Sequence, residues 1–228
     1  PQEAFAFAEE NALTGAVAPR LVMSHLACGD DPAHPLNRQQ AESFQAVRQA
    51  FADVESSLSN SAGIFLGSGF AFDLVRPGIA LYGGAPTGGP AQNPMKPVAT
   101  VEARIVQVRL ARAGETASYG ASQTLARDTA IAVVSAGYAD GYLRTASGKG
   151  HGFIHGQRVP VLGRITMDLT MFDVTDLGEG AVRAGDWIEL FGKNVAIDEA
   201  AHAAGTISYE LLTALGRRYH RRYVGPDG

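Results

Sequence analysis

The hydrophobic pattern of the chain changes near residue 96, and this change constrains the fold more than any other feature. Residues 1–95 alternate helical patterns with short extended runs, whereas from about residue 98 onward short segments alternate apolar and polar positions between glycine-containing turns. We therefore expect a βα domain over residues 1–95 and a small, mostly β domain over residues 96–228. The glycine- and proline-rich segment 83–97 is the expected linker.

The first half carries the signals of strand, helix and strand joined by short loops, which is typical of a parallel βα protein. A first helix is expected to end near Thr14, and apolar residues at helical spacing predict a second helix after residue 37. Asn37 is expected to cap that helix, with Gln40 as its reciprocal partner three residues later. The expected strands cover residues 21–27, 57–62 and 70–75.

The second half carries a longer strand pattern whose apolar phase inverts around Ile105, which predicts a β-bulge at that point. The turns that follow contain Ala139-Asp140-Gly141, His155-Gly156 and Leu177-Gly178. Further strands are expected at residues 130–136, 152–155, 159–164, 169–174 and 187–191, and short helices at residues 198–204 and 209–215.

Composition excludes several classes of protein. The 228 residues are enough to bury a sizeable core, and a net charge of −4 gives no reason to expect nucleic acid or an anionic membrane as partner. Cys28 is the single cysteine, so there is no disulfide framework. The basic segment 217–222 is expected to be a helix end followed by a polar edge strand, with phosphate contact as the alternative. His151 and His155 are four residues apart but lack further partners at ligand spacing, so no metal site is expected.

The chain begins inside a helical pattern and without an initiator methionine, so a preceding segment is expected. There is no run of eighteen apolar residues, hence no transmembrane helix. We expect a cytoplasmic location, with a periplasmic one left open.

Arg76 lies where an expected strand stops, and Pro77 and Gly78 follow it at once. Such an arginine is either a solvated loop charge or a group that binds a ligand. In βα barrels, ligands lie at the carboxyl ends of the strands, and phosphate often binds at the start of a short extra helix. Backbone N–H groups after Gly78 suit an anion, and glycine lets it approach closely.

Seven segments resemble the alanine racemases in order and spacing. They are SHLACGDDPAHPLNRQQ (24–40), LSNSAGI (58–64), FDLVRPGIALYG (72–83), SYGASQT (118–124), AGYADGYLR (136–144), LGRITMDLTMFDVTD (162–176) and ISYELLTALGRR (207–218). The resemblance covers nearly the whole chain. It implies a partial α/β barrel, the last strand–helix units of a TIM-type (β/α)8 barrel, followed by a mostly antiparallel β domain.

The resemblance also implies pyridoxal 5′-phosphate as cofactor and two acid/base groups on opposite faces of the substrate Cα. Family members carry a lysine that forms the Schiff base with the cofactor, in a context like K-A-x-A-Y-G-H-G. None of the three lysines of this chain (Lys96, Lys149 and Lys193) lies in such a context. The chain alone is therefore expected to be inactive.

Tyr119 matches the tyrosine that serves as the second acid/base group in the family. Arg76 matches the residue that faces the pyridine nitrogen, and His25 matches the histidine between that arginine and the tyrosine. From the residues alone, Tyr119 would be a tyrosine that finishes a strand and His25 a core residue. A guanidinium donates to the ring nitrogen but cannot protonate it.

The phosphate contacts implied by the resemblance are Ser61, the backbone of Gly78 and Ile79, and the hydroxyl of Tyr209. Otherwise Ser61 would only end a strand, and Tyr209 would cap or pack at a helix start. The backbone N–H of Met167 matches the group that holds the substrate carboxylate, although methionine is usually core filler.

A constricted entry corridor is implied at positions that are otherwise surface or packing residues. In the family, Tyr119, Tyr138 and Met167 reach the cofactor of the other subunit, so the resemblance implies a homodimer with shared sites. The corridor residues are Asp30, Tyr138, Arg144, Arg164 and Ile207.

Three functions are weighed. The leading hypothesis is interconversion of L-alanine and D-alanine, which supplies D-alanine for peptidoglycan synthesis in the bacterial cell wall. The second is a racemase of broader amino-acid specificity, which shares every motif above. The third is a non-catalytic module that has retained the fold, since the lysine is missing.

Overall fold

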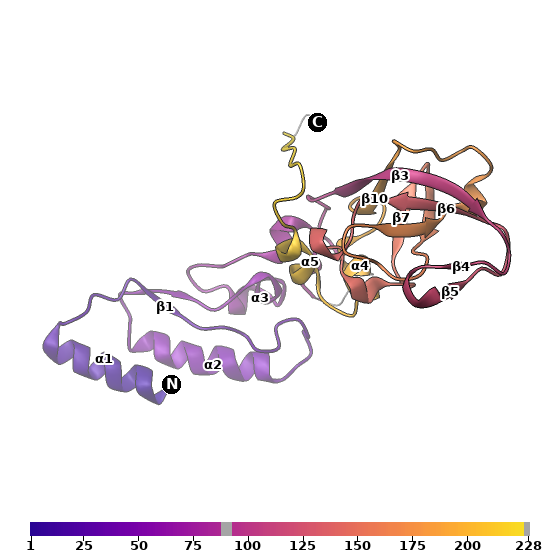
Figure 1. Cartoon of the computed structure of the whole chain (residues 1–228). Coiled ribbons are helices and arrows are strands. Elements are labelled where there is room, and N and C mark those ends of the chain that lie inside the picture. Colours follow the sequence, from indigo (N-terminus) through magenta and orange to yellow (C-terminus); the bar gives the residue numbers. More distant parts are fainter. Residues whose placement is uncertain (88–92, 226–228) are drawn as a thin grey trace. The chain divides into compact units, whose positions relative to one another are not determined.

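The computed structural model describes residues 1–87 and 93–225, which belong to two units, Pro1–Lys96 and Pro97–Gly228 (Figure 1). Residues 88–92 of the expected linker lie outside the described residues. The unit boundary lies one residue beyond the boundary expected from the sequence. The helices that the structure describes include none with the length and apolar character needed to span a membrane.

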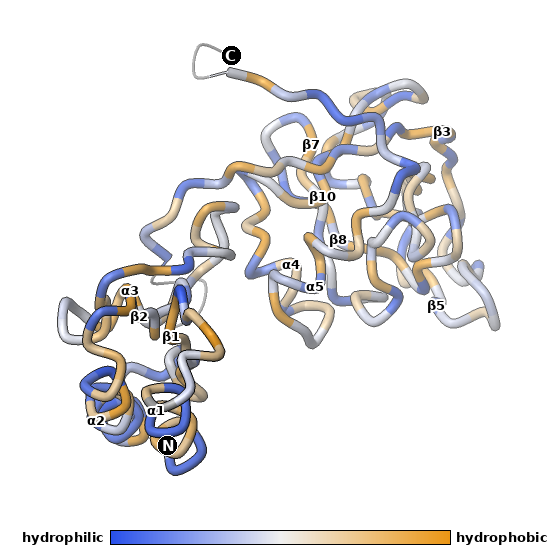
Figure 2. The backbone as a smooth tube through the Cα atoms, turned by 90° about the vertical axis from the view of Figure 1, so that its left-hand side faces the viewer, coloured by the Kyte–Doolittle hydropathy of each residue, from blue (hydrophilic) through white to orange (hydrophobic). Residues whose placement is uncertain are grey.

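The first unit is built on a parallel β1–β2 pair in the register Leu21↔Glu55 to Met23↔Ser57. Figures 1 and 2 both show α1 and α2 side by side and on the same side of this pair. Helix, strand, helix and strand follow one another as the sequence predicted. The elements are α1 (Gln2–Thr14), β1 (Leu21–Met23), α2 (Leu36–Gln49), β2 (Glu55–Ser57), α3 (Ser61–Phe65) and the 3-10 turns Ser68–Phe70 and Ile79–Tyr82.

A small core joins α2 to the strands of the first unit. Leu26, Phe44 and Leu58 are buried, and the Phe44 ring meets the Phe72 ring edge-on with centroids 4.9 Å apart. The apolar residues at helical spacing that predicted this helix include Phe44 and Val47, which are buried in α2, and Phe51 and Val54, which lie beyond its end at Gln49. The parallel pairing of β1 and β2 places their carboxyl ends next to each other.

The predicted Asn37 cap is wrong. The helix begins at Leu36 after Pro35, and no side chain caps it. The Asn37 side chain is buried and donates to the carbonyl of Asp31 at 2.9 Å. Gln40 instead reaches back to the end of β1, where it accepts from the Ala27 N–H at 2.9 Å and donates to the His25 carbonyl at 3.0 Å. Tertiary hydrogen bonds have replaced the local capping pattern.

The strands expected at residues 57–62 and 70–75 are also wrong. β2 ends at Ser57, and the Asn60 side chain caps α3 by accepting from the Gly63 N–H at 3.0 Å. Residues 70–75 form no regular strand, because Phe72 has a positive φ of 53°. The segment is instead fastened to β2 by the Asp73 carboxylate, which accepts from the Ser56 N–H at 2.9 Å and the Ser56 hydroxyl at 2.6 Å.

The second unit is an antiparallel six-stranded sheet in the order β8-β7-β10-β3-β6-β9. A further bridge from Val161 to Phe172 in β9, and a hydrogen bond from the Leu162 N–H to the Met171 carbonyl at 2.7 Å, join the two ends and close a barrel. The strands of this sheet are β3 (Val101–Ala111), β6 (Thr129–Val134), β7 (His151–Ile154), β8 (Gln157–Pro160), β9 (Thr170–Asp173) and β10 (Trp187–Phe191). A separate antiparallel pair, β4 (Thr116–Ala117) and β5 (Gln123–Thr124), lies between β3 and β6 in the sequence, and α4 (Ile197–Ala203) and α5 (Ser208–Ala214) follow β10.

The bulge predicted near Ile105 is confirmed, because the β3–β6 register shifts between Ile105 and Gln107. The bulge lies where β3 changes partner, because its residues 101–104 pair with β10 and its residues 105–111 pair with β6 (Figure 1). Phe172, Ile188 and Leu190 are fully buried inside. The polar edge strand expected within residues 217–222 is wrong, because no strand follows α5 in the part of the chain that the structure describes.

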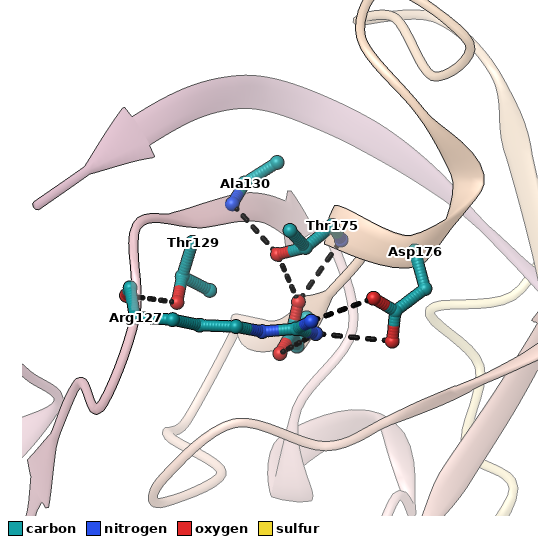
Figure 3. A network of polar contacts seen from close by, with 6 residues as sticks. Arg127, Thr129, Ala130, Thr175 and Asp176 are labelled. Atoms are coloured by element: carbon teal, nitrogen blue, oxygen red, sulfur yellow. Dashed lines mark hydrogen bonds and ion pairs between the residues drawn. The ribbon is translucent and has the colours of Figure 1, made fainter. Parts of the chain in front are cut away.

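A polar network fastens the start of β6 to the end of β9 (Figure 3). Arg127 binds both carboxylate oxygens of Asp176, at 2.7 and 3.0 Å, and Thr175 accepts from the Ala130 N–H at 3.0 Å. The hydrogen bonds from Arg127 hold the pKa of the Asp176 carboxyl below its ordinary value. The network stabilises the barrel and contains none of the predicted site residues.

Candidate active site

Arg76 is not a solvated loop charge. Its guanidinium bonds to the Ser57 hydroxyl, and it donates to the carbonyls of Ser24 at 2.8 Å and Leu58 at 3.3 Å. These partners follow or end β1 and β2, so one side chain ties the carboxyl ends of both parallel strands together. The rigid, donor-only fork of a guanidinium suits such a cluster of oxygen acceptors. The side chain is half-buried and held in one orientation at the strand ends.

His25 lies beside Arg76, as the resemblance implied. Its Nδ1 is 3.5 Å from a guanidinium nitrogen of Arg76, and its Nε2 is 3.3 Å from the Asn60 amide nitrogen. The backbone at His25 is held by Gln40 from α2. The imidazole is therefore fixed between two groups while the residue as a whole stays exposed. An exposed histidine held from both sides differs from the buried core histidine that its apolar neighbours suggested.

Ser61 and the segment after Arg76 form a corner that we call the Ser61 corner, comprising Ser61, Gly78, Ile79 and Ala80. The Ser61 hydroxyl oxygen accepts from the Gly78 N–H at 2.8 Å and from the Ala80 N–H at 3.3 Å. The Gly78 N–H, which belongs to the backbone implied as a phosphate contact, is thus already hydrogen-bonded within the protein. A Cβ added at Gly78 would meet no other atom within 4 Å, so the backbone there is open to a ligand.

Tyr119 lies in the 3-10 turn Tyr119–Ala121, at the tip of the β4–β5 hairpin, and its side chain is 72% exposed. Its neighbours have unusual backbone conformations, with φ of 70° at Ser118 and 47° at Ala121. Non-glycine residues in this region are strained, and such strain is concentrated at functional sites. The Ser118 hydroxyl holds the turn by accepting from the Arg164 N–H at 2.8 Å and donating to the Arg164 carbonyl at 3.2 Å.

Met167 lies in a tight turn between Thr166 and Leu169, where the Thr166 N–H donates to the Leu169 carbonyl at 3.0 Å. The Met167 carbonyl accepts from the Ala139 N–H at 3.0 Å, whereas its own N–H donates to no atom of the described residues. The residue is 54% exposed, which contradicts the alternative of core filler. A rigid turn with a free amide suits a carboxylate acceptor.

The remaining predicted residues lie in separate places. Asp30 is exposed in the turns after β1, and Arg144 is exposed in the 3-10 turn Arg144–Ala146. Ile207 precedes α5 and Tyr209 lies in its first turn, both with exposed side chains. No group of metal-ligating side chains occurs among the described residues, and His155 is 3.8 Å from Asp186.

Only some of the predicted residues are therefore brought together, in one set within each unit. His25 and Arg76 are in contact, and Ser61 contacts Gly78. In the second unit the Tyr119 turn is tied to Arg164, and the Tyr138 N–H donates to the Thr166 carbonyl at 2.9 Å, next to Met167.

Three supporting residues escaped the sequence analysis. Ser57, Asn60 and Ser118 hold Arg76, His25 and the Tyr119 turn, respectively. Each is a small polar residue whose sequence neighbours look like the end of a strand. The sequence could have indicated their supporting roles only through their positions, directly beside a predicted site residue or at a strand end.

The fold and these sites define a two-domain protein in which a βα unit, whose strand ends are tied together by an arginine, is joined to an antiparallel barrel with an exposed tyrosine. Residues 1–86 match the family model "Alanine racemase, N-terminal domain", and residues 98–223 match "Alanine racemase, C-terminal domain". The chain belongs to the alanine racemase family.

Relatives of known name agree with this assignment. The alanine racemase of Rhizobium meliloti is 59% identical over 99% of this chain and 62% of that protein, and the biosynthetic alanine racemase of Agrobacterium fabrum is 57% identical over 92% and 56%. The crystal structure of the Bartonella henselae alanine racemase with covalently bound pyridoxal phosphate has a TM-score of 0.89 at 39% identity, over 98% of this chain and 62% of that one. The chain thus spans 56–62% of the length of these relatives.

Proposed function

We propose that the protein containing this chain interconverts L-alanine and D-alanine with pyridoxal 5′-phosphate as cofactor, and so supplies D-alanine for peptidoglycan. Family membership and the names of the relatives support the substrate and the reaction. The observation that carries the proposal is the contact of Arg76 with His25 next to the Ser61 corner. Residues 1–95 are proposed to be the last part of the family's barrel.

The residues of the first unit suit this cofactor. A phosphate needs donors, and the Ser61 hydroxyl keeps its proton to donate, since its oxygen is the acceptor for the Gly78 and Ala80 amides. The start of the turn Ile79–Tyr82 adds backbone N–H groups, and Gly78 leaves space for close approach. Arg76 supplies a donor for a pyridine nitrogen.

When bound, pyridoxal phosphate acidifies the substrate Cα–H by delocalising the resulting negative charge. Tyr119 is proposed to move the proton at Cα on one face, since its phenol is exposed at the tip of a strained turn. The Met167 N–H is proposed to hold the substrate carboxylate and so to orient Cα. Tyr209 is proposed to add its hydroxyl to the phosphate contacts.

The second acid/base group is proposed to be a lysine that this chain does not supply. Lys96, Lys149 and Lys193 are all exposed, and none lies in the family's lysine motif. Since the chain spans about three-fifths of its relatives, the remainder of such a protein has room for that residue. Proton delivery from two faces then gives racemisation.

We further propose a homodimer in which Tyr119, Tyr138 and Met167 complete the site of the partner copy. Their exposed side chains support this arrangement, because a group that serves another chain must be accessible on its own. Asp30, Arg144, Arg164 and Ile207 are proposed to line the route by which substrate enters. Each of these four residues is exposed.

Borohydride reduction of the native protein with pyridoxal phosphate, followed by peptide mass mapping, tests the cofactor. We expect one reduced adduct on a lysine outside this chain, and the absence of any adduct on the active protein would contradict the proposal. Racemisation assays with L-alanine, L-serine and L-lysine test the substrate. Comparable turnover of L-lysine and L-alanine would contradict an alanine-specific racemase and support a racemase of broader amino-acid specificity.

A further inference from the structure

The segment after α5 contains a guanidinium that joins two carboxylates from distant parts of the second unit. The Arg218 Nε is 3.0 Å from the Asp140 Oδ1, and an Arg218 terminal nitrogen is 2.7 Å from the Asp168 Oδ1. Asp168 directly follows Met167, whose amide is proposed to hold the substrate carboxylate. We propose that Arg218 is a positioning residue that fixes the Met167 amide for substrate binding; this inference rests on the proposed function.

Asp140 connects Arg218 to the backbone of the turn at residues 137–140. Its Oδ2 accepts from the Gly137 N–H at 2.9 Å while its Oδ1 faces Arg218, so both oxygens are engaged. The Asp140 side chain is only 11% exposed, whereas those of Arg218 and Asp168 are 50% and 54% exposed. A carboxylate so shielded from water depends on its partners, because few water molecules can replace them.

Gly137 brings this turn into close backbone contact with the tight turn between Thr166 and Leu169, which we call the Met167 loop. A Cβ at position 137 would lie 2.3 Å from the Thr166 carbonyl oxygen and 2.4 Å from the Met167 carbonyl oxygen, distances that no real side chain tolerates. The Tyr138 and Ala139 N–H groups donate to the same two carbonyls, at 2.9 and 3.0 Å. The turn at residues 137–140 and the Met167 loop therefore move as one body.

The end of α5 packs against the same turn. A Cβ at Gly141 would lie 2.6 Å from the Ala214 carbonyl oxygen, so the helix end and the turn are in close backbone contact. Arg218, four residues further on, then spans from this helix end to the Met167 loop through Asp168. Its ion pairs with Asp168 and Asp140 raise the pKa of the guanidinium further above its ordinary value.

An arginine suits this position because it donates to both carboxylates at once through different nitrogens. A lysine has a single nitrogen and cannot reproduce the fork, although it retains the charge. Without Arg218, Asp168 loses its ion-pair partner. The Met167 loop then loses the contact that holds it next to the Met167 N–H. The amide contacts the carboxylate in the bound substrate and in the transition state alike, so a weakened contact is expected chiefly as a raised KM.

The test compares Arg218→Gln, Arg218→Lys and Asp168→Asn in the full-length protein with bound cofactor, measuring kcat and KM for L-alanine. The matched control is Arg217→Gln, because Arg217 is exposed and forms no ion pair within the described part of the chain. We expect Arg218→Gln to raise KM on the order of tenfold with kcat within about threefold of wild type. Arg218→Lys should restore part of the loss, and Asp168→Asn, which keeps the Asp140 pair, should raise KM by less.

An unchanged KM in Arg218→Gln and Asp168→Asn, or a fall in kcat alone, would overturn the inference. Equal effects of Arg217→Gln and Arg218→Gln would overturn it as well, because a general loss of positive charge would then explain both. If Arg218→Gln does not fold, Asp168→Asn decides the question. A wild-type protein that does not racemise alanine would instead overturn the proposed function.

Discussion

Substitution of Ser61 by alanine tests the Ser61 corner with the least disturbance elsewhere. The side chain is 1% exposed, and its oxygen accepts from the Gly78 N–H at 2.8 Å and the Ala80 N–H at 3.3 Å. Each neutral hydrogen bond contributes about 1 kcal/mol, and the longer one less, so alanine costs the corner roughly 1–2 kcal/mol. It also deletes the hydroxyl proposed to donate to the phosphate.

The affinity change comes from the lost hydroxyl itself, because a hydrogen bond to a charged phosphate contributes about 1.5–3 kcal/mol. Since 1.4 kcal/mol corresponds to about a tenfold change in affinity, Ser61→Ala should weaken pyridoxal phosphate binding at least about tenfold. Absorbance titration of the apoprotein with the cofactor measures the Kd. Ser68→Ala is the matched control, because Ser68 is exposed in the next 3-10 turn of the same unit. A Kd for Ser61→Ala within about twofold of wild type would refute the assignment of the phosphate to this corner.

Three further predictions address catalysis, the barrel core and the first unit. Tyr119→Phe should lower kcat for alanine by at least about 10²-fold while the cofactor Kd stays unchanged, and a fully active variant would remove Tyr119 from the mechanism. Phe172→Ala, which empties a fully buried position, should lower the free energy of unfolding of the second unit by about 3–5 kcal/mol in denaturant titration. Hydrogen bonds from the Ser56 side chain and backbone hold the pKa of Asp73 below its ordinary value of 3.8, so the carboxylate stabilises the fold above that value and loses this effect as pH falls through the lowered pKa. Asp73→Asn should therefore lower the unfolding midpoint at about pH 7, and this difference should shrink as the pH falls below 3.8, whereas a pH-independent difference would contradict this account.

The β half shows how far local patterns carry a prediction. The strand 187–191 and the bulge after Ile105 follow from alternation of apolar and polar residues, because a strand with one buried face must alternate. The closure of that sheet by Val161 and Phe172 joins residues whose pairing has no local signature. Closure depends on the tilt and register of all the strands together.

The βα half shows where local patterns fail. Residues 70–75 have a strand composition, yet Phe72 takes a positive φ and Asp73 turns its carboxylate onto Ser56. Asn37 and Gln40 fit a capping box, yet Gln40 serves the backbone next to His25. In each case a tertiary hydrogen bond outweighs a local preference worth about 1 kcal/mol.

By itself the sequence determined the family and the order of a βα half and a β half, and it named the candidate site residues. These follow from ordered motifs and from periodicity, which are properties of neighbours along the chain. Only the tertiary structure decided that Arg76 is held by Ser24, Ser57 and Leu58, and that Arg218 joins Asp140 to Asp168. Such contacts bring together groups that lie 18 to 78 positions apart in the chain, and their geometry depends on the packing of every element between them.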